Sequence, residues 1–249
     1  MSAGNSSARV ALITGAAGTM GAASAVRLAA DGYRVALVDI VQDRVNALAA
    51  QIGDASAPVI ADLSTAEGAA RAVSEAERAL GSIDILVNNA GILSNNKIAD
   101  TTPEEWHRVL GINLDSAFHL SRAVLPGMKS RRFGRIVNTC SYAMKSGGLT
   151  AGTAYTVSKG ALQALTFSLA REFAAFGITV NGIAPAYVKT PMVTEALTEA
   201  QRQALIAQIP VGRFCEPEEF AHVVAFLISP LAGFITGEII DLNGGLQFD

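Results

Sequence analysis

A tyrosine and a lysine four positions apart, Tyr155 and Lys159, are the residues in this sequence best suited to proton transfer. They fall in a pattern that predicts a helix over residues 154–176, where residues four apart lie on one face. A phenol has a reference pKa of roughly 10, and a nearby cation favours its charged form. The spacing therefore predicts that Lys159 lowers the pKa of Tyr155, making it a general acid or base. The same spacing also arises by coincidence, as a surface lysine beside a half-buried aromatic.

The composition excludes several classes of protein. Among 249 residues, 50% are hydrophobic and 16% are charged, which indicates extensive buried helix and sheet rather than disorder. The net charge of −3 gives no electrostatic reason to expect nucleic acid. Cys140 and Cys215 form no disulfide framework, and no Cys/His cluster predicts a metal. Residues 1–8 lack a signal-peptide core, and the apolar run 220–235 is interrupted by polar residues, so we expect a cytoplasmic protein without membrane contact.

Strand and helix patterns alternate along the chain. This alternation predicts an α/β protein with a parallel sheet covered by helices on both faces. We expect one domain over residues 9–249 after a flexible N-terminus, with a helical flap near 190–211. Aliphatic and β-branched runs predict strands at 9–14, 34–39, 58–62, 83–88, 134–139, 178–183 and 238–242. Helices are predicted at 19–31, 42–52, 66–80, 103–132 with a kink near Pro126, and 154–176.

A glycine-rich turn follows the first predicted strand. Gly15, Gly18 and Gly21 would let the backbone approach a pyrophosphate, and the following helix would direct free N–H groups at it. The alternative is a turn whose small residues serve packing. The second strand ends in Asp39, which could bind both ribose hydroxyls and would repel a 2′-phosphate. No basic side chain follows before Arg44, so NAD is predicted over NADP, unless Asp39 only caps the next helix.

Further motifs follow in a recognisable order. They are Thr14-Gly15 to Gly21, Asp62-Leu63, Asn88-Asn89-Ala90-Gly91, Asn113, Ser141, Tyr155 to Lys159, Pro185 and Thr190. From Arg9 onward the chain resembles the classical short-chain dehydrogenases/reductases. The resemblance implies a Rossmann-type doubly wound parallel sheet of seven strands in the order 3-2-1-4-5-6-7. The sequence departs from the family at Thr19, where the loop usually has glycine, and at Ala186, where glycine follows the proline.

The resemblance also implies a catalytic set of Asn113, Ser141, Tyr155 and Lys159. In the family the serine binds the substrate oxygen, the tyrosine exchanges the proton, and the lysine binds the nicotinamide ribose and lowers the tyrosine pKa. The asparagine holds a water that links the lysine to solvent. Ser141 could instead cap a turn, and Asn113 could bond backbone in an irregular helix. The implied cofactor contacts are Gly15, Gly18, Thr19, Met20, Gly21, Asp39, Ile40, Asp62, Leu63, Asn89, Ala90, Gly91, Tyr155, Lys159, Pro185, Val188 and Thr190.

The substrate is less determined by the sequence. The candidate lining residues are Ser94, Asn95, Tyr142, Lys145, Tyr187 and Met192. Their amides and phenols favour a secondary alcohol that is polar, such as a polyol, sugar or hydroxy acid. Lys145 would meet an anionic group or be a solvated loop lysine.

Two alternatives stay open. The chain also resembles the 3-oxoacyl-[acyl-carrier-protein] reductases, although Asp39 disfavours their NADPH and Phe176 replaces a basic docking residue. Arg131 and Arg132 could still supply a docking patch. The other alternative is a non-catalytic nucleotide-binding scaffold on the same fold, which would usually lack the tyrosine or the lysine. The family further implies a homotetramer or homodimer.

Overall fold

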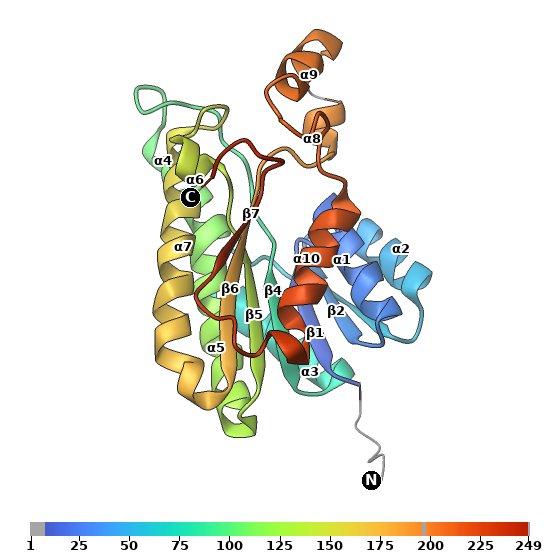
Figure 1. The fold of residues 1–249 in the computed structure, drawn as a ribbon. Coiled ribbons are helices and arrows are strands. Elements are labelled where there is room, and N and C mark those ends of the chain that lie inside the picture. The colour runs from blue at the N-terminus through green and yellow to red at the C-terminus, as the bar shows by residue number, and fades with distance from the viewer. Residues whose placement is uncertain (1–7, 196–197, 249) are drawn as a thin grey trace.

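The computed structural model describes residues 8–195 and 198–248. Figure 1 shows a central sheet with helices on both faces. All of its strand pairs are parallel, and their order is β3-β2-β1-β4-β5-β6-β7, so the predicted fold class is confirmed. The strands are β1 (Val10–Thr14), β2 (Arg34–Asp39), β3 (Ser56–Ile60), β4 (Ile83–Asn88), β5 (Gly134–Thr139), β6 (Ile178–Pro185) and β7 (Ile239–Leu242).

The strands are mostly apolar because both faces of the sheet are buried. Along β1, Leu12 packs into one core cluster, whereas Ala11 and Ile13 pack into the other. Side chains alternate between the faces of a strand, so each strand contributes to both cores. One face carries α1 (Thr19–Ala30), α2 (Gln42–Ile52) and α10 (Pro217–Ile228). The other carries α3 (Ala66–Leu80), α5 (Ser116–Arg131) and α7 (Thr153–Phe173).

Two predicted elements differ most from those observed. The third strand is Ser56–Ile60 rather than 58–62, so Asp62 lies beyond it. Pro58 lies within this strand, and β3 is an edge strand, where a residue without an N–H is tolerated. The predicted helix over 103–132 is divided into α4 (Pro103–Leu110), a π-helical segment (Gly111–Asp115) and α5. Pro126 lies inside α5, and the interruption falls at the π-helical segment instead.

The predicted flap is helical in its described part. It contains α8 (Pro191–Thr194) and α9 (Glu199–Ile206), which stand over the carboxyl ends of the strands (Figure 1). Val193, Ile209 and Phe214 form a small separate core there, against Tyr187 and Leu205. The short helix α6 (Ala143–Ser146) follows β5. No helix in the described ranges has the length and apolar character needed to cross a membrane.

Candidate active site

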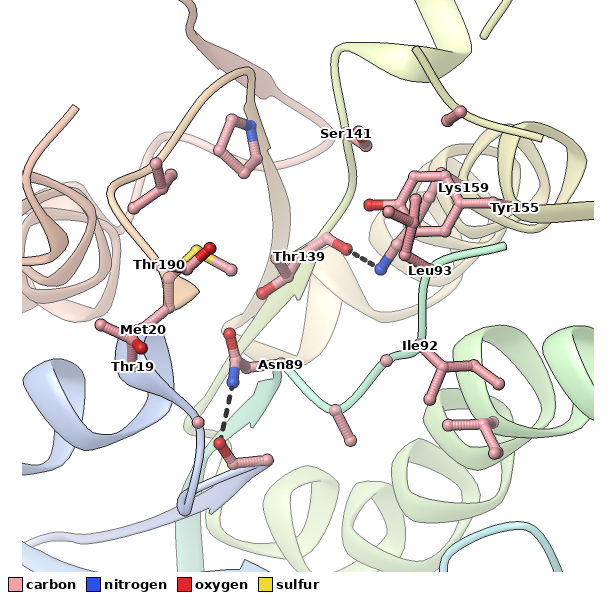
Figure 2. Close-up of a pocket in the computed structure, with 18 of the residues that line it drawn as sticks. Thr19, Met20, Asn89, Ile92, Leu93, Thr139, Ser141, Tyr155, Lys159 and Thr190 are labelled. Carbon is pink, nitrogen blue, oxygen red and sulfur yellow. Dashed lines mark hydrogen bonds between the residues drawn. The ribbon is translucent and has the colours of Figure 1, made fainter. Parts of the chain in front are cut away.

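A cavity of about 790 Å³ lies at the carboxyl edge of the sheet. In an open α/β sheet this edge is where ligands bind. We call the part formed by Gly15, Thr19, Asp39 and Asp62 the nucleotide end. The part around Ser141 and Tyr155, with the flap above it, is the reaction end (Figure 2).

The nucleotide end has the shape that a pyrophosphate requires. Gly15 has φ of +66°, and a Cβ added to it would lie 2.9 Å from Asn89 Nδ2. Helix α1 begins at Thr19 with no side-chain cap hydrogen bond, so its first amides are not occupied by a capping side chain. Thr19 and Met20 line the cavity despite the departure from the family's glycine pattern. A phosphate at this helix terminus is therefore well matched by backbone donors.

Gly21 does not line the cavity, unlike the other predicted cofactor residues, all of which do. A Cβ on Gly21 would lie 2.2 Å from the carbonyl oxygen of Gly15. This glycine is needed because α1 packs directly on the turn. Gly21 was predicted to contact the cofactor, but in the structure it allows close packing. Packing by small residues was the alternative interpretation of the glycine-rich turn.

Asp39 lines the cavity and also organises the surrounding turn. Its carboxylate accepts hydrogen bonds from Ala17 N at 3.0 Å, Ile40 N at 2.8 Å and Val41 N at 3.1 Å. Two carboxylate oxygens offer about four lone pairs, so these bonds leave capacity for ribose hydroxyls. Arg44 also lines this end. The nucleotide end of the cavity therefore also contains a cation, which comes from helix α2.

Lys159 is almost fully buried, and its ammonium donates a hydrogen bond to the carbonyl oxygen of Thr139 at 2.7 Å (Figure 2). Burial lowers the pKa of Lys159 to about 8. Its Nζ lies 5.7 Å from the centre of the Tyr155 ring. The pair is therefore brought together on one face of α7, as the spacing predicts.

The pKa of Tyr155 does not follow the sequence prediction. Burial raises this pKa above its ordinary value, and a hydrogen bond with Ser141 acts in the opposite direction. The net shift is therefore opposite to the predicted one, because the cost of burying a phenolate dominates. A protonated Tyr155 at neutral pH is suited to donate a proton.

Ser141 follows β5 and lines the cavity beside Tyr155. Its Oγ also accepts a hydrogen bond from Ala143 N at 3.1 Å, at the start of α6. The hydroxyl therefore caps a turn, as the alternative interpretation predicted, and it also faces the reaction end, where the predicted hydrogen bond to a substrate oxygen would form. The adjacent Cys140 is buried, and burial raises the pKa of its thiol to about 11, which makes it a poor nucleophile.

Asn113 is buried in the π-helical segment and does not line the cavity. Its Oδ1 accepts from Ile92 N at 2.8 Å, and its Nδ2 donates to Ile92 O at 3.0 Å and Ser158 Oγ at 3.0 Å. The side chain thus bonds backbone in an irregular helix, as the alternative proposed. A Cβ on Gly91 would lie 3.3 Å from Asn113 Oδ1 and 3.4 Å from Lys159 Nζ, so glycine keeps the space between them open.

The predicted substrate residues separate into two groups. Asn95, Tyr142 and Tyr187 line the cavity. Ser94 does not, because its hydroxyl is hydrogen-bonded to Glu105 of α4. Lys145 does not either, since it forms an ion pair with Asp241 of β7 at 2.7 Å and is neither a solvated lysine nor part of the lining. The side chain of Met192 lies outside the described residues.

The sequence did not identify several lining residues. Apolar side chains from the loop after β4 and from the flap enter the reaction end, and Thr139 provides the acceptor for Lys159. None of them belongs to a sequence motif whose residue types and spacing predict a chemical role. A helical pattern over the flap indicated α9, but only tertiary structure shows which side faces the cavity. These residues are Ile92, Leu93, Ser146, Thr150 and Leu205.

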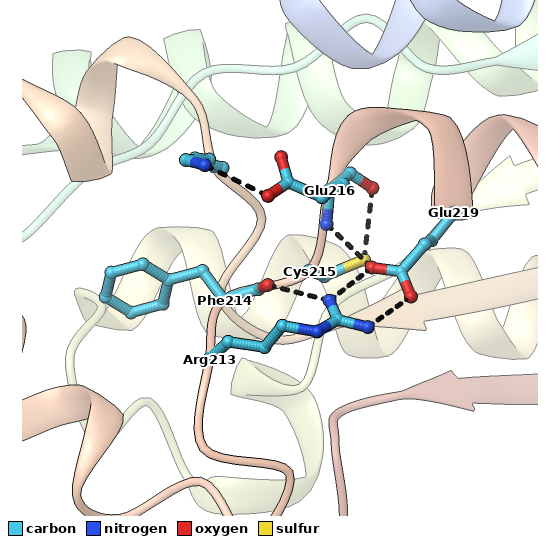
Figure 3. Close-up of polar contacts among 6 residues, drawn as sticks. Arg213, Phe214, Cys215, Glu216 and Glu219 are labelled. Carbon is cyan, nitrogen blue, oxygen red and sulfur yellow. Dashed lines mark hydrogen bonds and ion pairs between the residues drawn. The ribbon is translucent and has the colours of Figure 1, made fainter.

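Polar contacts join the residues on either side of the flap to the start of α10 (Figure 3). Arg213 donates to both oxygens of Glu219 at 2.6 and 2.7 Å, and Lys189 pairs with Glu216 at 3.0 Å. Cys215 forms an isolated parallel bridge with Val188, a residue of the cavity wall. These contacts join the end of the flap to the first turn of α10.

Comparisons with known proteins agree on the family. A family model described as enoyl-(acyl carrier protein) reductase matches residues 15–247. The acetoacetyl-CoA reductase of Rhizobium meliloti (strain 1021) is 43% identical over 242 residues, which cover 96% of this chain and 99% of that protein.

Two solved structures from Brucella melitensis are similar over nearly the whole chain. One is described as short-chain dehydrogenase/reductase SDR:Glucose/ribitol dehydrogenase, with a TM-score of 0.90 and 36% identity, covering 97% of each chain. The other is a 3-ketoacyl-(acyl-carrier-protein) reductase complexed with NADH, with a TM-score of 0.90 and 33% identity, covering 96% of this chain and 98% of that one. The chain belongs to the classical short-chain dehydrogenase/reductase family, a family of oxidoreductases.

Proposed function

We propose that this protein is a ketoreductase that converts 3-oxoacyl thioesters into 3-hydroxyacyl thioesters with NADH. The observation that carries the proposal is the largely uncharged lining of the reaction end. Leu93, Val193 and Leu205 lie in the cavity that holds the hydroxyls of Ser141 and Tyr155. Among the lining residues that the structure describes, Lys159 is the charged one at this end, and its ammonium is already held by Thr139. An uncharged acyl chain bearing a ketone suits these walls.

The relatives support the same substrate class. The Rhizobium meliloti protein is an acetoacetyl-CoA reductase, and one Brucella melitensis neighbour is a 3-ketoacyl-(acyl-carrier-protein) reductase complexed with NADH. Asp39 in the nucleotide end favours NADH over NADPH because its charge would repel a 2′-phosphate. The backbone donors at Thr19 and Met20 and the carboxylate of Asp39 would hold the cofactor.

The chain's own groups perform the proton transfer. Bound NADH would supply the hydride to the carbonyl carbon of the substrate. Tyr155 would donate its hydroxyl proton to the carbonyl oxygen, and its raised pKa keeps it protonated for that step. Ser141 would donate a hydrogen bond to the same oxygen and orient the ketone. The products are the alcohol and the oxidised cofactor, so hydride and proton are both accounted for.

The thioester carrier is proposed to be coenzyme A rather than a carrier protein. Arg131, a predicted docking residue, lies 3.3 Å from the carboxylate of Asp84. Arg132 donates to the carbonyl oxygen of Ala175 at 2.9 Å. Both guanidinium groups thus make contacts within the fold, and Phe176 stands where a basic residue would help docking.

A second candidate is the oxidation of a polyol or sugar with NAD. Hydroxyl and amide groups of Asn95, Tyr142, Ser146, Thr150 and Tyr187 line the cavity and would bind a polar substrate. The neighbour from Brucella melitensis described as a glucose/ribitol dehydrogenase favours this candidate. A hydroxy acid is less well supported, because the predicted cation Lys145 is paired with Asp241.

A spectrophotometric assay separates the two candidates. The purified protein is expected to oxidise NADH when acetoacetyl-CoA is added, and to do so with a higher kcat/KM than with NADPH. Ribitol and glucose with NAD form the comparison series. Turnover of these polyols without turnover of acetoacetyl-CoA would reject the thioester proposal in favour of the second candidate.

A further inference from the structure

Two loops at the reaction end are joined by a set of close hydrogen bonds. We call residues 94–97 the substrate loop and residues 148–153 the α7 lead, because the latter runs into the helix that carries Tyr155. Gly152 N donates to Ser94 O at 2.6 Å, and Thr153 N donates to Asn96 O at 3.0 Å. The ammonium of Lys97 donates to the carbonyl oxygens of Gly148 at 2.6 Å and Ala151 at 2.7 Å. The side chain of Lys97 therefore binds two carbonyl groups of the α7 lead, its first and its fourth.

The approach of the two loops requires glycine at position 152. A Cβ there would lie 2.5 Å from Asn96 O and 2.7 Å from Ser94 O, closer than real Cβ contacts. The backbone of Gly152 has φ of −79° and ψ of 173°, an extended conformation that any residue adopts. The need for glycine is thus a matter of space between the loops rather than of backbone strain.

The substrate loop is fixed on its other side by α4. Glu105, in the first turn of α4, accepts a hydrogen bond from Asn96 Nδ2 at 2.7 Å and is also bonded to the hydroxyl of Ser94. Asn95 lies between these anchored residues and lines the cavity, as do Thr150 and Ala151 of the α7 lead. Both walls next to Tyr155 are therefore held by groups that do not themselves face the cavity.

We propose that Lys97 is a positioning residue for the reaction, acting through Asn95, Ala151 and the start of α7. A charged donor to two carbonyl oxygens makes stronger hydrogen bonds than neutral groups do. Its removal leaves Gly148 O and Ala151 O without this donor and weakens the junction between the two loops, which then depends on the backbone hydrogen bonds from Gly152 and Thr153. Tyr155 is the third residue of α7, so displacement of the α7 lead changes the placement of its hydroxyl relative to Ser141.

The test compares Lys97→Met with Lys129→Met, the same change at a lysine that stacks on Phe176 at the far end of α5. This inference rests on the proposed ketoreductase function for its kinetic readout. We expect kcat/KM for acetoacetyl-CoA to fall by about 10- to 100-fold in Lys97→Met, since small misplacements of reacting groups have effects of this size. The KM for NADH should stay unchanged, because the nucleotide end is built from other segments. Lys97→Arg should restore most of the activity.

A second readout does not depend on turnover. Amide hydrogen exchange at Gly152 and Thr153 should become faster in Lys97→Met and remain at the wild-type rate in Lys129→Met. Gly152→Ala, whose methyl group separates the same two loops, should give the same kinetic pattern. Wild-type kcat and KM in Lys97→Met would overturn the proposal, as would an equal loss of NADH binding. If the wild type reduces no thioester, the proposed function fails while the exchange rates still decide whether Lys97 joins the loops.

Discussion

At its nucleotide end the cavity is lined by three charged side chains, Asp39, Arg44 and Asp62, whereas at its reaction end Lys159 is the charged one among the described lining residues. The two ends also differ in how they are held. The nucleotide end consists of turns that directly follow β1, β2, β3 and β4. The hydroxyl of Thr14 in β1 accepts hydrogen bonds from the backbone amides of Asn89 and Ala90 at 3.0 and 2.9 Å. The reaction end is assembled from longer loops and from the flap.

This difference shows where specificity for each ligand arises. Turns that directly follow strands hold their backbone N–H groups in fixed positions. Fixed donors are well matched to the phosphate groups that every nicotinamide cofactor contains. Loops held by side chains such as Lys97 and Glu105 can change without altering the sheet, which suits a variable substrate. The four predictions below test this division between the two ends.

The largest effect is expected from Tyr155→Phe at the reaction end. Removal of the hydroxyl takes away the proton donor, so kcat should fall by about 10²- to 10⁴-fold. NADH binding, measured by fluorescence titration, should persist because the nucleotide end is unchanged. Tyr33→Phe, the same change immediately before β2 at the opposite edge of the sheet, should leave both quantities unaltered. Wild-type turnover in Tyr155→Phe would reject the proton-transfer role.

Asp39→Asn tests the nucleotide end alone. Loss of the charge removes the repulsion of a 2′-phosphate, and the ratio of kcat/KM for NADPH to that for NADH should rise about tenfold, or about 1.4 kcal/mol. The nearby Asp43 is exposed in the first turn of α2, so Asp43→Asn is the matched control and should not change the ratio. A change in substrate KM without any change in cofactor preference would contradict the division between the ends.

Lys159 predicts a dependence of stability on pH. Its pKa falls from an ordinary 10.5 to about 8 in the folded protein because of burial. Between these values the unfolded chain holds a proton that the folded chain has lost, so this group's contribution to the free energy of unfolding rises with pH there. Relative to Lys159→Met, the wild type should gain up to about 1.4 kcal/mol per pH unit in this window.

Urea unfolding of both proteins at several pH values measures this difference. Cys140 and Tyr155 have raised pKa values and act in the opposite direction at high pH, but they are common to both proteins. A stability difference that does not vary between pH 8 and 10.5 would show that Lys159 keeps its ordinary pKa.

The smallest effect is expected at the exposed contact that joins the flap to α10. Hydrogen bonding to Arg213 lowers the pKa of Glu219 from 4.5 to about 2. The contribution of this carboxylate is therefore present above pH 4.5 and lost as the pH falls towards 2. Because the pair is solvent-exposed, Glu219→Gln should lower Tm by no more than about 2 °C at neutral pH. A larger loss, or one that persists in acid, would point to another cause.

The sequence alone determined the alternation of strands and helices, the glycine turn after β1 and the placement of Tyr155 and Lys159 on one helix face. These features depend on local periodicity and on neighbours close in the chain, which a sequence displays directly. Asn88 of the same residue order has a structural role, since its Nδ2 donates to Asn138 Oδ1 of β5 at 2.8 Å. The family's residue order then brought Ser141 and Asn113 into the same prediction.

Only the tertiary structure decided which side chains face the cavity and how their environment changes their chemistry. Ser94 and Lys145 turn away to Glu105 and Asp241, partners 11 and 96 positions distant in the chain. Burial by residues from several elements reverses the expected pKa shift of Tyr155. Lys97 bonds carbonyl groups 51 and 54 positions away. Such long-range contacts and burial arise only when the chain is folded. They therefore cannot be predicted from the local sequence pattern around each residue.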